Sequence, residues 1–100
     1  MTECNFGCES EVLCMSFGEA VAMMKVGAKV ARKGWNGDGM FAWYVPEGLY
    51  PARMEAIKGV FPNDMVPYRP YFALKTAQND VATWCPSVSD QLANDWVLIN

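Results

Sequence analysis

The strongest periodic pattern of apolar positions begins shortly after residue 15. Four apolar residues repeat at intervals of three and four: Phe17, Ala20, Val21 and Met24. This spacing is that of one face of an α-helix, so the segment predicts an amphipathic helix of about ten residues. Ser16 and Glu19 stand where the two partners of a capping box belong, and Gly27 follows the last apolar position, as glycine after a helix end often does.

Five later segments are rich in β-branched and aromatic residues or alternate polar with apolar positions, as short strands do. They are residues 29–32, 40–45, 71–76, 81–84 and 96–99. A glycine-rich loop with an Asn-Gly pair joins the first two segments, and a polar turn at residues 78–80 joins the next two, so we expect two hairpins. Ser87 and Asp90 form a second capping-box pattern, which predicts a short helix through Ala93.

These elements predict an α+β fold. We expect an antiparallel sheet of four or five strands, made from the two hairpins plus the C-terminal strand and packed on the N-terminal helix, with a second short helix. Between the hairpins, residues 46–70 contain five prolines and no sustained periodicity. We interpret this stretch as a long irregular excursion with one helical turn around residues 53–58, and loops of this length are usually functional or mobile.

One hundred residues are enough for one domain and too few for two. We expect residues 1–14 to form a flexible N-terminal extension and residues 15–100 to form the single domain. Aromatic residues make up 13% of the chain, which is more than so small a core needs. Some aromatic side chains are therefore expected to face a ligand or another subunit.

Charge and hydropathy exclude two kinds of partner. A formal net charge of −3 argues against duplex nucleic acid, because contacts to phosphates supply most of the non-specific affinity for it. No apolar run approaches the roughly 18 residues of a membrane span, and the acidic N-terminal segment lacks the basic start of a signal peptide. We therefore expect a cytoplasmic protein with no membrane partner.

The chain contains four cysteines, whose expected state depends on the redox conditions of the cytoplasm. In a reducing cytoplasm Cys4, Cys8, Cys14 and Cys85 are expected to be free thiols, with Cys85 acting as a small buried hydrophobe. The first three are separated by three and five residues, which matches no common zinc pattern. A disulfide or metal role for these three is the alternative.

The chain contains no histidine. This excludes Ser-His-Asp triads, Cys-His pairs and histidine metal ligands. General acid–base catalysis near pH 7 would need a carboxylate, lysine or cysteine with a strongly shifted pKa. The composition therefore favours binding over catalysis.

Trp35 and Asn36, in the glycine-rich loop, are the first candidate binding residues. A tryptophan in a loop offers a flat face on which a nucleobase can stack, and an asparagine offers a donor and an acceptor for a base edge or a ribose. The same residues also have a structural interpretation. In it, Trp35 covers the end of the sheet and Asn36 only takes a left-handed turn conformation.

Trp84, Ser87 and Asp90 form a second candidate group. A hydroxyl at a helix start, beside unpaired amides, can hold a phosphate or ribose oxygen. The alternative is that Ser87 and Asp90 only cap their own helix. A pyrophosphate could be neutralised by Lys75, Arg32 and Lys33, and the alternative for each is a solvated charge at a strand edge.

Several short motifs occur together between the first helix and the last strand. They are Phe-Gly-Glu-Ala at 17–20, Ala-Arg-Lys-Gly-Trp-Asn-Gly at 31–37, Leu-Lys-Thr-Ala at 74–77, Trp84, Ser87, Asp90, and Leu-Ala-Asn-Asp-Trp at 92–96. This combination resembles a phage and prophage family whose characterised members are the second type of Thoeris anti-defence protein. The resemblance covers the chain from about Met15 to Asn100, except for parts of residues 46–70, which have no counterpart in it. The Trp-Asn-Gly loop and the closing Asp-Trp pair are its most specific parts.

The resemblance implies a protein that binds glycocyclic ADP-ribose, the signal of Thoeris defence, and removes it from solution without cleaving it. It also implies a homotetramer with nucleotide pockets between protomers, no cofactor, and in some relatives a separate site for cyclic oligonucleotide signals of another defence system. Carried onto this sequence, the ligand-binding residues are Trp35, Asn36, Gly37, Phe41, Lys75, Thr76, Trp84, Ser87 and Asp90.

A pocket between protomers would draw its residues from two chains. One such arrangement takes the loop residues Trp35 and Asn36 from one chain and Trp84, Ser87 and Asp90 from its neighbour. Two other function classes stay open on the residues alone. One is a structural or protein-interaction module of a phage or prophage that uses its aromatic side chains as an interface, and the other is a nucleotide-processing enzyme.

Overall fold

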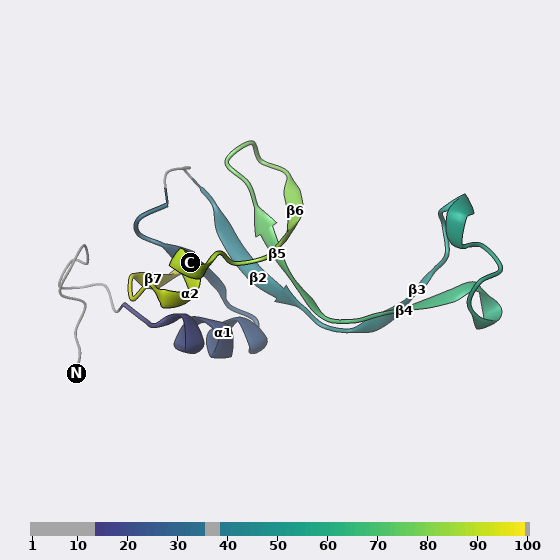
Figure 1. Ribbon diagram of the computed structural model, residues 1–100, viewed down its shortest axis with the longest axis horizontal. Helices are drawn as coiled ribbons and strands as arrows, with labels where there is room; N and C mark the ends of the chain where they lie inside the picture. Colours follow the sequence, from purple (N-terminus) through teal and green to yellow (C-terminus); the bar gives the residue numbers. More distant parts are fainter. Residues whose placement is uncertain (1–13, 36–38, 100) are drawn as a thin grey trace.

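The computed structural model describes residues 14–35 and 39–99. In these residues the fold consists of one five-stranded antiparallel sheet, two α-helices and a long two-stranded arm (Figure 1). The sheet contains β1 (Lys29–Arg32), β2 (Phe41–Val45), β5 (Tyr71–Lys75), β6 (Val81–Trp84) and β7 (Trp96–Ile99). Its strand order is β6-β5-β2-β1-β7, and every neighbouring pair is antiparallel.

The predicted α+β class, the two hairpins and the C-terminal strand are confirmed. The hairpins are β1–β2 and β5–β6, and the C-terminal strand β7 adds to the free edge of β1, with Arg32 opposite Trp96. The sheet therefore has five strands, the upper of the two numbers expected. The two hairpins meet at the β2–β5 pair in the centre of the sheet.

Helix α1 (Phe17–Lys25) has the capping box that the sequence predicts. The Ser16 hydroxyl accepts from the backbone N–H of Glu19 at 3.2 Å, and the Glu19 carboxylate accepts from the backbone N–H of Ser16 at 2.9 Å. These two bonds satisfy amides at the helix start that have no partner within the helix. Just before the helix, Met15 exchanges two backbone hydrogen bonds with Trp96 and so joins the helix start to β7.

Helix α2 (Val88–Leu92) starts at a second capping box, between Ser87 and Asp90. The prediction from the sequence is confirmed here as well. α2 contacts α1, and it stands directly before the turn that leads into β7. At only five residues, the helix depends on its caps and on packing for its stability.

The core lies between α1 and one face of the sheet. Its fully buried members are Ala20 and Met24 from α1, Val30 and Ala42 from the central strands, and Trp96 from β7. Trp96 is the largest of them, and its indole N–H donates to the backbone carbonyl of Asp90 at 3.0 Å. That bond satisfies a polar group that would otherwise be buried without a partner.

The strand registers divide the side chains of the sheet into two faces. Val30, Ala42 and Leu74 lie opposite one another along the ladder and face the helices, together with the core. Because side chains alternate along a strand, Phe41 and Trp43 must point to the other face. We call this face, which is turned away from the core that α1 covers, the open face.

Residues 46–70 form an arm, and here the sequence-based prediction was partly wrong. The stretch contains two paired strands, β3 (Gly48–Pro51) and β4 (Met65–Tyr68), which continue β2 and β5 away from the sheet (Figure 1). Between them lie two 3₁₀ turns, η1 (Glu55–Ile57) and η2 (Pro62–Asp64). The helical turn predicted around 53–58 is thus confirmed, whereas an irregular path at 48–51 and 65–68 is not.

The prolines of the arm are the reason why the sequence did not predict these strands. In the ribbon, Leu49 lies opposite Pro67 and Pro51 lies opposite Met65. In an antiparallel ladder, pairs that exchange N–H···O bonds alternate with pairs that do not. The two pairs that contain proline are two positions apart, so both are of the second type. Proline lacks an N–H, so it costs the ribbon no hydrogen bond at these positions.

Two expectations about cysteine were also wrong. Cys14 is disulfide-bonded, so it is not a free thiol. Cys85 is free but exposed, because it directly follows Trp84, whose side chain packs against the core. Alternation along the chain therefore turns Cys85 away from the core. The predicted extension 1–14 lies outside the described residues except for Cys14.

Met24 and Val26 provide a matched test of where the core lies, because both are at the C-terminal end of α1. Met24 is 1% exposed and Val26 is 78% exposed. Met24→Ala should lower the free energy of unfolding by about 2–5 kcal/mol, since it leaves a cavity. Val26→Ala should change it by no more than about 0.5 kcal/mol. Urea unfolding followed by circular dichroism measures both, and equal losses would contradict this core.

Candidate functional site

A cluster of aromatic rings lies where α1, α2 and the loop after β1 meet. Trp35, Trp84 and Trp96 are in mutual contact, with ring centroids 5.3–5.9 Å apart and nearly perpendicular or strongly inclined planes. Phe17 and Phe72 extend the cluster on either side. Edge-to-face contacts of this kind are favourable beyond the apolar area they bury.

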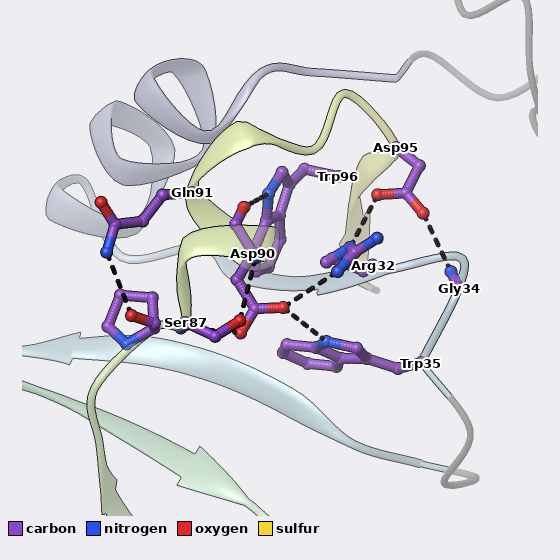
Figure 2. Close-up of polar contacts among 9 residues, drawn as sticks. Arg32, Gly34, Trp35, Ser87, Asp90, Gln91, Asp95 and Trp96 are labelled. Carbon is purple, nitrogen blue, oxygen red and sulfur yellow. Dashed lines mark hydrogen bonds and ion pairs between the residues drawn. The ribbon is translucent and has the colours of Figure 1, made fainter.

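The Asp90 carboxylate is the polar centre of this region (Figure 2). Its Oδ1 accepts from the indole Nε1 of Trp35 at 3.3 Å and from Nη1 of Arg32 at 3.0 Å. Its Oδ2 accepts from the backbone N–H of Ser87 at 3.2 Å. One side chain therefore caps α2, pairs with a cation and orients Trp35.

Arg32 connects Asp90 to a second carboxylate, that of Asp95. Arg32 Nε donates to Asp95 Oδ1 at 2.9 Å, and Asp95 Oδ2 accepts from the backbone N–H of Gly34 at 3.0 Å. A Cβ at position 34 would lie 3.1 Å from that same oxygen, so a glycine allows the close approach. The start of the glycine-rich loop is thus held against the turn before β7.

The electrostatics follow from this arrangement. Burial raises the pKa of the Asp90 carboxyl, but the hydrogen bonds from Arg32, the Ser87 amide and Trp35 outweigh it, and the net pKa lies below the ordinary value of 3.8. The pKa of Arg32 is raised, mainly by its hydrogen bond to Asp95. Burial acts in the opposite direction, and the hydrogen bond to Asp90 adds to the increase. Arg32 is therefore held by two ion pairs, one to Asp90 and one to Asp95.

The structure brings several of the predicted binding residues together within one chain. Trp35 contacts Trp84 and Asp90 of its own chain, and the arrangement that takes these groups from two neighbouring chains stays a prediction. The capping role of Ser87 and Asp90 is present. Trp35 is half-buried and also covers this end of the sheet. A ligand-binding role for Trp35, Trp84, Ser87 and Asp90 stays a prediction.

The other predicted residues lie elsewhere. Phe41 is on the open face, where the ammonium groups of Lys29 and Lys75 lie 5.1 and 5.9 Å from the centre of its ring. Lys75 Nζ also donates to the backbone carbonyl of Gly39 at 3.2 Å. The hydroxyl of Thr76 is used within the β5–β6 turn, where it donates to Asp80. These residues form a second group, for which ligand binding also stays a prediction.

Asn36 and Gly37 lie outside the described residues. The described residues nearest to them are held at both ends of the loop. Trp35 is fixed through Asp90, and Gly39 is contacted by Lys75.

Sequence reasoning missed the part that Arg32 and Asp95 take in this site. The sequence predicts for Arg32 either a contact to a pyrophosphate or a solvated charge at a strand edge, and neither prediction includes a partner within the chain. The one usable signal was Asp95 directly before a buried tryptophan, in the segment that carries the family resemblance. The pairing itself joins residues 63 positions apart, which local patterns do not reveal.

The site offers aromatic rings, and the open face offers ammonium groups beside a further ring. Within residues 14–35 and 39–99, no group of three histidine, cysteine, aspartate or glutamate side chains is placed to hold a metal ion. Likewise, no helix in those ranges is long and apolar enough to span a bilayer.

Comparison with known proteins gives two matches. A family model described as "Thoeris anti-defense 2-like domain" matches residues 15–99. The chain is also similar to "Thoeris anti-defense 2" of Bacillus phage SP01, with 36% identity over 86 residues, which covers 86% of this chain and 96% of that protein.

The lowered pKa of Asp90 predicts how stability depends on pH. The carboxylate stabilises the fold above the unfolded-state pKa, and this contribution is lost as the pH falls through the lower folded-state pKa. At pH 7, Asp90→Asn should lower the free energy of unfolding by about 1–3 kcal/mol, because charged hydrogen bonds are lost. Below about pH 4, the difference in free energy of unfolding between Asp90→Asn and the natural protein should become smaller.

Urea unfolding at pH 7 and at about pH 3 measures this difference. Glu55→Gln, at an exposed position on the arm, is the control and should match the natural protein at both pH values. A difference for Asp90→Asn that stays constant across the two pH values would contradict the ion-pair account.

Proposed function

The chain belongs to the Thoeris anti-defense 2-like family, and we propose from this that it inhibits Thoeris defence by binding its signal, glycocyclic ADP-ribose, and sequestering it. The proposal is that of a non-catalytic sponge, with no cofactor. The cyclic oligonucleotide signals of a second defence system are included as further ligands. A phage anti-defence protein acts inside the host cell, and we propose the cytoplasm as its place of action.

The state of the charged groups in the site supports binding without cleavage. Arg32, Asp90 and Asp95 are engaged with one another, and the pKa of Asp90 is lowered and not raised toward neutrality. An acid or base that works near pH 7 needs a pKa near that value. The two carboxylates of the described site, Asp90 and Asp95, are both ion-paired with Arg32, which is unlike a pair of carboxylates that acts on a substrate.

The aromatic and cationic groups support a nucleotide as the ligand class. Stacking of a base on a tryptophan ring contributes about 1–3 kcal/mol, and we assign this role to Trp35. Lys75, in the second group, is assigned to the pyrophosphate. A protein with a net charge of −3 can still bind such a dianion, because charge-assisted hydrogen bonds are local and strong.

The position of the two groups supports a pocket between copies. Trp35 lies on the helix side of the sheet and Phe41 and Lys75 lie on the open face. A ligand that contacts both groups of one chain would have to pass around the sheet, whereas a ligand between two copies can contact one group from each. We therefore retain the homotetramer and propose that a pocket combines the Trp35 side of one copy with the open face of another.

The second candidate function, a protein-interaction module, is favoured by one observation. The arm exposes several large apolar side chains, including Leu49 and Met54. Such a surface is typical of a contact with another protein. The ligand experiment that follows separates the two functions, because a protein-interaction module would leave the nucleotide in solution.

Recovery of the ligand is the decisive test of the sponge. We expect incubation with glycocyclic ADP-ribose to remove it from the filtrate, and heating of the complex to return it with unchanged chromatographic mobility and mass. Recovery of a linear or hydrolysed product would show an enzyme. Full ligand in the filtrate at micromolar protein would contradict binding, and cyclic oligonucleotides can be tested in the same way.

Single substitutions test the two residue groups. Trp35→Ala should raise the Kd for glycocyclic ADP-ribose about 10- to 100-fold, which corresponds to the stacking energy lost. Lys75→Ala should also weaken binding, whereas Lys58→Ala, on the exposed arm, should not. Because Trp35 also packs against Trp84 and Trp96, calorimetry is done well below the Tm of each variant. Unchanged affinity in Trp35→Ala would leave Trp35 with a packing role alone.

A further inference from the structure

The loop after β1 begins at residues that are bound to Asp95, in the turn before β7. Asp95 Oδ1 accepts from Arg32 Nε at 2.9 Å, and Asp95 Oδ2 accepts from the Gly34 amide at 3.0 Å (Figure 2). The backbone carbonyl of Asp95 accepts from the Lys33 amide at 3.0 Å. Three successive residues at the start of the loop are therefore held by one aspartate.

Trp35 follows directly on this anchored segment. Its backbone N–H donates to the Arg32 carbonyl at 3.2 Å, which closes a turn of the backbone. Its indole N–H donates to Asp90 Oδ1 at 3.3 Å, and the same oxygen accepts from Arg32 Nη1 at 3.0 Å. Both hydrogen bonds of Trp35 therefore depend on Arg32. One goes to the carbonyl of Arg32, and the other goes to a carboxylate that Arg32 holds in place.

The orientation of the Trp35 ring follows from these bonds together with two ring contacts. The rings of Trp84 and Trp96 lie 5.9 and 5.3 Å from it, at angles of 84° and 81°. Contacts between rings are favourable over a range of offsets and tilts, whereas a hydrogen bond requires a narrow range of directions. The bond to Asp90 is therefore the contact that selects one orientation of the ring.

The ion pairs behind this bond are shielded from water. The side chains of Arg32, Asp90 and Asp95 are 22%, 14% and 19% exposed. An ion pair at an exposed position contributes little, because water screens it and both side chains stay mobile. Charge-assisted hydrogen bonds at partly buried positions are shorter and stronger. The pKa of Asp90 is lowered, so the carboxylate that accepts from Trp35 is charged at neutral pH.

We infer that Arg32 and Asp95 are positioning residues for the ligand, which hold the Trp35 ring in its binding orientation before the ligand arrives. The inference rests on the proposed function, in which Trp35 is the stacking residue. Neither Arg32 nor Asp95 has to contact the ligand in this role. A side chain that is already ordered loses less conformational entropy on binding, so the affinity is higher than for the same ring held loosely.

Asp95→Asn is the central variant. Asparagine has the shape of aspartate, but its NH2 group cannot accept a hydrogen bond, so only one of the two side-chain contacts can remain. Calorimetric titration with glycocyclic ADP-ribose should give a Kd about 3- to 10-fold above that of the natural protein, which corresponds to ordering one side chain on binding. Glu55→Gln makes the same chemical change at an exposed position and should leave the Kd unchanged.

Hydrogen exchange of the indoles separates positioning from a general loss of stability. Trp35 and Trp96 both donate their indole N–H to Asp90, Trp35 to the carboxylate and Trp96 to the backbone carbonyl. In ligand-free Asp95→Asn, NMR should show faster exchange of the Trp35 indole and an unchanged rate for Trp96. Equal acceleration of both would show only destabilisation and would overturn the inference, as would an unchanged rate for Trp35.

A double-mutant cycle tests whether Asp95 acts through Trp35. In that case Asp95→Asn should raise the Kd of the natural protein and have no further effect in Trp35→Ala, because the ring to be positioned is gone. An equal increase in both backgrounds would show that Asp95 affects binding by another route. That result would also overturn the inference.

Arg32→Lys keeps the test decisive if circular dichroism shows that Asp95→Asn does not fold. Lysine keeps the positive charge, but its single ammonium group does not reproduce the paired contacts of the planar guanidinium. The Kd and the exchange rate of the Trp35 indole should increase as in Asp95→Asn. Arg69→Lys, at an exposed position, is the matched control and should change neither quantity.

The failure of this inference and the failure of the proposed function appear in different measurements. If the natural protein does not bind glycocyclic ADP-ribose, the proposed ligand fails, and the indole exchange rates still decide whether Arg32 and Asp95 position Trp35. If the natural protein and Asp95→Asn bind the nucleotide equally well, the proposed ligand stands and the positioning role fails.

Discussion

The ion pairs of Arg32 with Asp90 and Asp95 determine how the functional region is assembled. Arg32 ends β1, Asp90 belongs to α2 and Asp95 lies in the turn before β7, so two bonds of 2.9–3.0 Å hold three elements together. The same carboxylates accept from the Trp35 indole and the Gly34 amide. Removal of one partner would leave a partly buried charge without compensation, which is why such networks are sensitive to single changes.

The sheet separates the residues that could contact a nucleotide. Trp35 and Trp84 pack with the core on the helix side, whereas Phe41 and Lys75 stand on the open face. Under the proposed function, a ligand that contacts both groups would therefore lie between two copies of the chain.

Much of the fold could be predicted from the sequence because its signals are local. The capping boxes at Ser16 and Ser87, the period of α1 and the two hairpins each depend on residues within a few positions of one another. The strands of the arm could not be predicted in the same way. Pro51 and Pro67 argue against strands in general, and only their placement in register pairs without hydrogen bonds makes them acceptable.

For the site, the sequence by itself determined which residue types are present: no histidine, a tryptophan in a glycine-rich loop, and an Asp-Trp pair before the last strand. Only the tertiary structure decided what these residues contact. Trp35 donates a hydrogen bond to Asp90, Arg32 forms ion pairs with two carboxylates, and Phe41 lies on the opposite face of the sheet. The physical reason is the distance along the sequence. The hydrogen bonds of Asp90 and Asp95 with Trp35 and Arg32 join residues from 55 to 63 positions apart, so they depend on how the sheet packs and not on local spacing.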